Sequence, residues 1–216
     1  RDTLLLLEHP NVYTFGRKGS ADNLLWDEAE CRRRGVDIVW CDRGGDVTYH
    51  GPGQLVGYPI LGLQNHGDDV VAYLRKLEDS LIAYLQTIEI PGTTVPGMTG
   101  VWSQGRGLAH RADPAKVAAI GIKFSRSVVS HGFALNLSTD LDYFAGIVPC
   151  GLAGKEAASV ASLGGPVINT QSAALSYSLA FRETFTVDTI WRDAADLPWG
   201  VAPRLPIDTG HQLRVI

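Results

Sequence analysis

Cysteine is scarce in this sequence, and its three cysteines, Cys31, Cys41 and Cys150, include no CxxC pair. An odd number without that spacing predicts neither a disulfide framework nor a zinc site, and we expect a reducing, cytoplasmic setting. Long apolar runs are also lacking. The longest one near the start covers only Leu4 to Leu7, which is too short for a signal peptide or a membrane span, so we expect no membrane partner.

The sequence also lacks an excess of positive charge, since 19 Lys and Arg face 23 Asp and Glu for a net charge of -4. Without an RRM, KH or helix-turn-helix signature, this balance predicts no nucleic-acid partner. The acidic residues show no carboxylate pair and no metal-ligand spacing. Because the Walker and GxGxxG patterns are absent too, we expect no metal and no other cofactor.

The chain has 216 residues with 45% hydrophobic and 19% charged composition, which fits one large domain or two small ones. We find no internal repeat and no linker between domains. The sequence therefore favours one α+β domain over residues 1–216, with a mixed β-sheet and helices packed on it. It begins with Arg1 rather than Met, so the N-terminus looks trimmed.

Periodicity and turn residues divide the chain into expected strands and helices. We expect strands at residues 3–8, 12–15, 36–41, 55–60, 116–124 and 127–137. Helices are expected at residues 21–34, 140–144 and 170–185, with a long amphipathic helix beginning at Asp68 or Asp69. The Gly- and Pro-rich segment 91–115 is predicted to be mostly loop, with Val101 and Trp102 as its only strand-like residues. The tail from residue 186 is predicted to be weakly structured.

Glycines are densest between Arg43 and Ile60, where they occupy positions 44, 45, 51, 53 and 57. Such density predicts a loop whose backbone approaches another group closely. Arg43, Tyr49 and His50 are then candidates to contact a ligand. A tight turn between two strands is the alternative interpretation of the same residues.

Cys150 is expected in an irregular loop, IVPCGL at 147–152, where a substrate can reach its sulfur. A nucleophilic cysteine needs a thiolate, and therefore a positive charge or a base beside it. Lys116 and Lys123 are seven residues apart, so on a regular strand they point to opposite faces. The residues alone do not choose among the possible partners, which are Lys116, Lys123, His50 and His131.

The strand HGFALN at 131–136 has small residues among large ones, which lets a backbone approach a ligand. His131 is alternatively a hydrogen-bonded core histidine. No Cys-His-Asn order typical of cysteine proteases is evident, although His131 and Asn136 keep that alternative open.

Several segments, in matching order and spacing, resemble the octanoyltransferases of lipoate biosynthesis, also called lipoyl(octanoyl) transferases. They are EHPNVYTFGR at 8–17, RGGDVTYHGPGQLVGYPI at 43–60, KVAAIG at 116–121, SHGFALNL at 130–137 and IVPCGL at 147–152. The resemblance runs from about residue 3 to 165 and implies the catalytic fold of biotin and lipoate protein ligases. It implies transfer of an octanoyl group from acyl carrier protein, through a cysteine thioester, to a lipoyl-domain lysine. The implied acceptors are lipoyl domains of 2-oxoacid dehydrogenase complexes or the glycine cleavage H protein.

The same resemblance, position by position, places the acyl-enzyme cysteine at Cys150 and its partner lysine at Lys116, so Lys123 becomes a bystander. It implies substrate contacts by Arg43, Gly44, Gly45, Asp46, Val47, Thr48, Tyr49, His50, Ala119, Ile120, Gly121, Gly132, Phe133 and Ala134. The small residues among them are expected to leave room for the octanoyl tail.

Two departures from the family pattern stand out. The resemblance implies a further strand and helix before the segment that begins here, so we expect part of the sheet edge to be absent. Ala161-Ser162-Leu163 stands where the family often has Thr-Ser-Leu.

Two other functions remain as alternatives. An ATP-dependent lipoate or biotin ligase would share the fold, but it would activate its acid as an adenylate and would not need Cys150. The sequence TYHGPGQ also differs from the nucleotide-binding pattern expected of such ligases. The second alternative is a non-catalytic module that binds an acyl group or a carrier protein.

Overall fold

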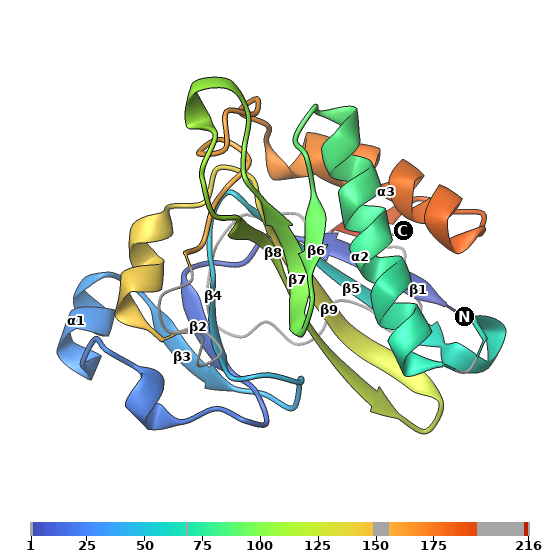
Figure 1. Cartoon of the computed structure of the whole chain (residues 1–216). Helices are drawn as coiled ribbons and strands as arrows, with labels where there is room; N and C mark the ends of the chain where they lie inside the picture. Colours follow the sequence, from blue (N-terminus) through green and yellow to red (C-terminus); the bar gives the residue numbers. More distant parts are fainter. Residues whose placement is uncertain (1, 68, 149–155, 194–213, 216) are drawn as a thin grey trace.

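The computed structural model describes residues 2–67, 69–148, 156–193 and 214–215 (Figure 1). Its strands are β1 (Thr3–Leu7), β2 (Val12–Phe15), β3 (Asp37–Trp40), β4 (Val47–His50), β5 (Gln54–Gly62), β6 (Thr93–Val95), β7 (Met98–Ser103), β8 (Ala115–Ser125), β9 (Val128–Asn136), β10 (Arg192–Asp193) and β11 (Arg214–Val215). Its α-helices are α1 (Glu28–Arg33), α2 (Val70–Thr87) and α3 (Thr170–Phe185). Short 3₁₀ helices are η1 (Ala21–Asn23), η2 (Leu63–Asn65), η3 (Gly107–Ala109) and η4 (Leu141–Gly146).

The strands form two sheets. The large sheet has eight strands in the order β10-β11-β1-β5-β9-β8-β7-β6, and each described neighbouring pair is antiparallel. The small sheet has the order β3-β2-β4, with β2 parallel to β3 and antiparallel to β4. Strands of both directions together with packed helices confirm the predicted α+β class.

Each sheet has its own core. Figure 1 shows α2 and α3 together on one side of the large sheet, and the small sheet with α1 on the other side. The large core joins buried residues of β1, β5, β7, β8 and β9 to those of α2 and α3. The small core joins the small sheet to α1 and η4 through residues such as Tyr13, Tyr49 and Ile147. The candidate site is described below from the residues that connect the two sheets.

Helix α2 is predicted correctly because its sequence carries both a cap and an apolar stripe. The Asp69 side chain accepts hydrogen bonds from the backbone N–H groups of Val71 and Ala72, which stabilises the first turn. Tyr73, Leu77 and Leu81 recur every four residues and are buried in the large core. Helix α3 covers the predicted range 170–185, and Asn169 caps it by accepting from the N–H of Ser172.

Val101 and Trp102 lie in a strand as predicted, but they are not the only strand residues of segment 91–115, because β6 and β7 form a hairpin at the edge of the large sheet. Pro96 and Gly97 provide its turn, and Gly97 has a φ of +77°. The density of Gly and Pro indicated a loop, whereas these residues only connect two short strands.

Two further elements differ in detail from the prediction. The helix expected at 21–34 is divided into η1 and α1, since Asp27 caps a new helix by accepting from the N–H of Glu30. The strand expected at 36–41 is β3 at Asp37–Trp40, and all four of its residues are exposed at the edge of the small sheet.

The glycine-rich stretch is less of a loop than its composition predicts. Strand β4 and most of β5 lie within it, so only residues 43–46 and 51–53 remain as connections. In the tail, β10 and β11 pair with each other and β11 pairs with β1, while the prediction for residues 194–213 falls outside the described residues.

Candidate active site

Lys116 lies where the chain returns to the large sheet after the segment that contains Cys150. Its N–H donates to the carbonyl of Glu156, and its own carbonyl accepts from the N–H of Ala158, both at 2.9 Å. Its Nζ lies 4.8 Å from the ring centroid of Trp102, an arrangement that stabilises an ammonium cation. Cys150 itself lies outside the described residues.

A β-bulge in β8 lies next to Lys116 and affects the direction of its side chain. In β7, Val101 pairs with Ala118 of β8, and the next residue, Trp102, pairs with Lys116. Strand β8 therefore has one extra residue, Val117, between these two pairs. A bulge interrupts the alternation of side chains along a strand. The seven-residue spacing alone therefore does not decide which faces Lys116 and Lys123 take.

Lys123 has a different environment. Its Nζ forms an ion pair with the carboxylate of Asp42, which also lies 2.7 Å from His131 Nε2. Hydrogen bonds from Lys123 and His131 lower the pKa of the Asp42 carboxyl to about 2. A carboxylate thus neutralises the charge of Lys123, whereas Lys116 Nζ lies over an aromatic ring.

Helix α2 contacts β7 next to the bulge. Gly100 in β7 has a φ of +118°, and its N–H donates to the buried carboxylate of Glu78 at 3.0 Å. A Cβ atom at Gly100 would lie 2.5 Å from the carbonyl oxygen of Ala118 and 3.5 Å from Cε of Lys116. The backbone next to Lys116 therefore requires a glycine at position 100 and an acceptor at Glu78 for its buried N–H.

Replacing Glu78 by leucine is expected to lower the free energy of unfolding by about 2 kcal/mol, because the buried N–H of Gly100 loses its acceptor. Urea unfolding would measure the change. Arg75→Ala is the control, because it keeps the bond from Gly100 to Glu78 and removes only a partner whose side chain is 60% exposed, so we expect a smaller loss. Equal losses in the two variants would contradict this account.

The connection at residues 43–46 is docked on both sheets. The N–H of Gly44 donates to the carbonyl of Ile122 in β8 at 2.8 Å. The Arg43 guanidinium is buried and donates to Thr14 Oγ1 in β2 at 2.9 Å and to the carbonyl of Gly44 at 3.0 Å. Asp46 accepts from the N–H of Val47 at 2.7 Å. These bonds hold the loop in place beside β8.

The expectation that the small residues leave room for an acyl tail is wrong at two positions. A Cβ atom at Gly121 would lie 2.9 Å from the carbonyl oxygen of Gly44, and one at Gly132 would lie 2.2 Å from that of Gly57. Protein backbone therefore fills both spaces. Ala119 and Ala134, which are direct partners across β8 and β9, remain as the small side chains of the predicted set.

The structure brings the predicted contact residues of β4, β8 and β9 to both cores. Val47 and Tyr49 are buried in the small core, where the Tyr49 ring stacks on Tyr143 with centroids 4.9 Å apart. Phe133 is buried in the large core, 4.7 Å from the ring of Tyr177. These side chains pack against protein, so any contact with a substrate would come from their backbone. The other predicted positions, Gly45, Thr48 and Ile120, are half-buried.

His50 is the most strongly perturbed histidine of the described chain. It is 7% exposed, its Nδ1 donates to Gln54 Oε1 at 2.8 Å, and its Nε2 lies 3.3 Å from Thr14 Oγ1. Burial lowers the pKa of His50 from 6.5 to about 3, and the nearby charges of His9 and Arg43 act in the same direction. The imidazole is therefore neutral at physiological pH and serves as a hydrogen-bond link.

This histidine predicts a pH dependence of stability. Because its folded pKa lies below the unfolded value, the unfolded chain binds more protons, and stability falls as pH drops from about 6.5 toward 3. Between pH 7 and pH 5 the loss from His50 should be about 2 kcal/mol, and the lowered pKa of His9 acts in the same direction. Urea titrations at both pH values should show a smaller difference for His50→Gln. An unchanged difference in that variant would contradict the assignment.

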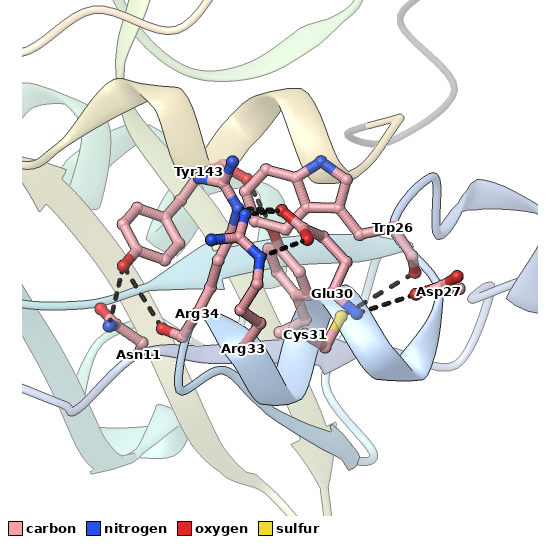
Figure 2. A network of polar contacts seen from close by, with 9 residues as sticks. Asn11, Trp26, Asp27, Glu30, Cys31, Arg33, Arg34 and Tyr143 are labelled. Carbon is pink, nitrogen blue, oxygen red and sulfur yellow. Dashed lines mark hydrogen bonds and ion pairs between the residues drawn. The ribbon is translucent and has the colours of Figure 1, made fainter.

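The two described cysteines both have hydrogen-bond partners in the protein. Figure 2 shows Cys31 on α1 within a polar network that includes Trp26, Asp27 and Glu30. Burial raises the pKa of the Cys31 thiol, and the negative charges of Asp27 and Glu30 raise it further. Cys41 Sγ donates to the carbonyl of Phe15 at 3.3 Å. Cys31 therefore lacks the electropositive surroundings that a reactive thiolate needs.

Metal sites and membrane-spanning helices are two other features that a domain of this size can carry. Over the described ranges, no group of three or more His, Cys, Asp or Glu is arranged to hold a metal ion. None of the described helices has the length and apolar character to cross a membrane.

The sequence of this chain matches a known family. Residues 1–182 match the lipoyl protein ligase A/B catalytic domain. The chain belongs to this family. It is 50% identical over 162 residues to an octanoyltransferase of Koribacter versatilis, covering 74% of this chain and 62% of that protein. It is 53% identical over 163 residues to one of Solibacter usitatus, covering 76% and 70%. It is 43% identical over 190 residues to one of Christiangramia forsetii, covering 87% and 79%.

Solved structures of the family have the same fold. A bipartite lipoate protein ligase from Thermoplasma acidophilum matches with a TM-score of 0.70 at 16% identity, over 87% of this chain and 72% of that one. A lipoate-protein ligase A bound with ATP matches with a TM-score of 0.68 at 15% identity, over 87% and 74%. The family membership thus confirms the predicted resemblance, and the octanoyltransferase relatives support acyl transfer in protein lipoylation as its activity.

Proposed function

We propose that this domain transfers an octanoyl group from octanoyl-acyl carrier protein to a lysine of a lipoyl domain, with Cys150 as nucleophile and Lys116 as its partner. One observation carries the assignment of Lys116. Both backbone hydrogen-bonding groups of Lys116 are bonded to residues 156–158, only six to eight residues after Cys150 in the chain. Since six residues span at most about 20 Å, the thiol is tethered to the neighbourhood of this lysine.

The proposed reaction has two steps. The Lys116 ammonium favours the Cys150 thiolate, which attacks the thioester carbon of the carrier; a new C–S bond forms as the old one breaks, and the carrier leaves as a thiolate that takes up a proton. Next, the neutral amine of an acceptor lysine attacks the enzyme thioester. An amide bond forms, the Cys150 sulfur leaves, and the proton lost by the amine returns to the thiolate or passes to a neighbouring base.

Chain-length preference follows from burial of the alkyl tail. Each buried methylene contributes about 0.8 kcal/mol, so an octanoyl tail contributes about 5 kcal/mol of binding. Ala119 and Ala134 are the small side chains that would border it, and the glycine positions of the predicted set would contribute backbone. The proposal needs no metal or cofactor, and it places the reaction in the cytoplasm.

The direct test is the intact mass of the protein after incubation with octanoyl-acyl carrier protein. We expect an octanoyl adduct that hydroxylamine removes and that Cys150→Ser does not form. An unchanged transfer rate in Cys150→Ser would exclude this mechanism.

Two alternatives have distinct outcomes. An ATP-dependent ligase would exchange labelled pyrophosphate into ATP in the presence of octanoate or lipoate, which a thioester-dependent transferase would not do. A non-catalytic binding module would bind the acylated carrier without any adduct or transfer.

A further inference from the structure

A continuous series of buried side-chain hydrogen bonds crosses from the small sheet to the large sheet. His50 Nδ1 donates to Gln54 Oε1 at 2.8 Å, and Gln54 Nε2 donates to Asn136 Oδ1 at 2.8 Å. Asn136 Nδ2 then donates to the carbonyl of Ala158 at 3.0 Å. Gln54 and Asn136 are only 1% and 4% exposed, so these bonds are made away from solvent.

The two ends of this series reach both halves of the proposed site. At one end, His50 Nε2 lies 3.3 Å from Thr14 Oγ1, which accepts from the Arg43 guanidinium of the glycine loop. At the other end, the N–H of Ala158 donates to the carbonyl of Lys116 at 2.9 Å. The series therefore connects the loop at 43–46 to the backbone of Lys116.

Each amide in the series has its orientation fixed by its neighbours. The Gln54 amide nitrogen donates both to Asn136 Oδ1 and to the carbonyl of Tyr49 at 3.1 Å, so its oxygen must face His50. Asn136 must then present its oxygen to Gln54 and its nitrogen to Ala158. Reversing either amide would bring two donors or two acceptors together in a buried space, which is costly.

We infer that Gln54 and Asn136 are positioning residues for acyl transfer, because they hold residue 158, and with it Lys116, in fixed register with the glycine loop. This inference rests on the proposed function. Gln54 and Asn136 are direct partners across β5 and β9, so the support is built on two central strands. The N–H of Val160 donates to the Asn136 carbonyl at 2.9 Å, which fixes the same segment at a second point.

The expected effect is on rate rather than on binding. A displacement of about 1 Å at reacting groups can cost on the order of 100-fold in rate. In Asn136→Leu and Gln54→Met we expect kcat for octanoyl transfer to fall about 100-fold, while the KM for the acylated carrier changes by less than about threefold. We also expect the midpoint of the pH–rate profile for thioester formation to move upward, because a displaced Lys116 favours the thiolate less.

A matched control separates positioning from general loss of stability. Ser80 is fully buried in the large core, where its Oγ lies 2.9 Å from Tyr177 Oη. Neither residue belongs to the hydrogen-bond series of His50, Gln54 and Asn136. Ser80→Ala removes a buried hydrogen bond of similar kind. We expect it to lower the unfolding midpoint while kcat and the pH–rate midpoint stay at the wild-type values.

The outcomes are distinct. Wild-type kcat and an unmoved pH midpoint in a folded Asn136→Leu or Gln54→Met would overturn the inference. If Asn136→Leu does not fold, Gln54→Met and Asn136→Ser decide by the same criteria. If the wild-type protein itself forms no hydroxylamine-sensitive adduct, the proposed function fails, which is a different result from unaffected variants of an active protein.

Discussion

Replacing Lys116 by alanine is expected to reduce octanoyl transfer by about 10²- to 10⁴-fold, the range that one positioned acid–base group contributes. Its ammonium lies over the Trp102 ring, and its backbone is bonded to the segment that follows Cys150. Loss of the cation should leave the thiol protonated at neutral pH, so thioester formation should slow more than carrier binding. Single-turnover acylation of Cys150, followed by intact mass, measures this step directly.

Lys123→Ala is the matched control, because it removes the same charge from the same strand. We expect it to keep most of the activity, since Lys123 is paired with Asp42. Lys116→Arg adds a second distinction: partial activity would indicate that the positive charge is what matters, and none would indicate proton transfer by the amine. Full activity in Lys116→Ala with loss in Lys123→Ala would show that the two roles are reversed.

Replacing Gly132 by alanine is expected to lower the free energy of unfolding by about 3 kcal/mol, the upper part of the usual range for overpacking. The new Cβ would lie 2.2 Å from the carbonyl oxygen of Gly57 and 2.5 Å from Cδ of Pro59. Both belong to β5, a central strand with little freedom to move. Urea unfolding with an unchanged m-value would measure the loss.

Gly35→Ala serves as the control for this variant. Gly35 has a φ of +64° but nothing within 4 Å of an added Cβ, so only backbone strain opposes the change, at about 1 to 2 kcal/mol. At Gly132 the backbone is not strained, and the added Cβ is opposed only by its contacts with β5. A smaller loss at Gly132 than at Gly35 would show that β5 and β9 separate readily.

Regular elements with a strong pattern were predictable from the sequence. Helix α2 carries a capping aspartate and an apolar stripe, and the β8–β9 hairpin has two long strands around one turn, at Arg126 and Ser127 in the structure. Both patterns depend on neighbours in sequence, which is why they are visible there. The predicted strands, 116–124 and 127–137, left only residues 125 and 126 between them, so the turn lies one residue later than expected.

The errors came where tertiary contacts override local composition. The β6–β7 hairpin is stabilised by pairing with β8, which a Gly- and Pro-rich sequence does not reveal. The bulge at Val117 lies beside Gly100, whose N–H is bonded to Glu78 on a helix 22 positions away in the chain. No periodicity in β8 itself could show that the alternation of side chains is broken.

The candidate site divides in the same way. The resemblance indicated Lys116 because a family motif surrounds it, and the structure adds the neighbours that physical reasoning lacked. Gln54 and Asn136 were missed as a pair because 82 residues separate them in the chain. A buried polar residue in each of two strands was the only available signal, and partners at that separation cannot be assigned from one sequence.

The order of strands in the large sheet also bears on how the protein is made. Strand β5 pairs with β1 on one edge and with β9 on the other, and Val56 is a partner of Ala134. At 5 to 20 residues per second, a ribosome needs about 4 to 16 s to add the intervening residues. For that time the nascent chain exposes an apolar strand with one unpaired edge, which is a template for aggregation. Yield in cells should therefore respond to translation speed between β5 and β9 more than to speed elsewhere.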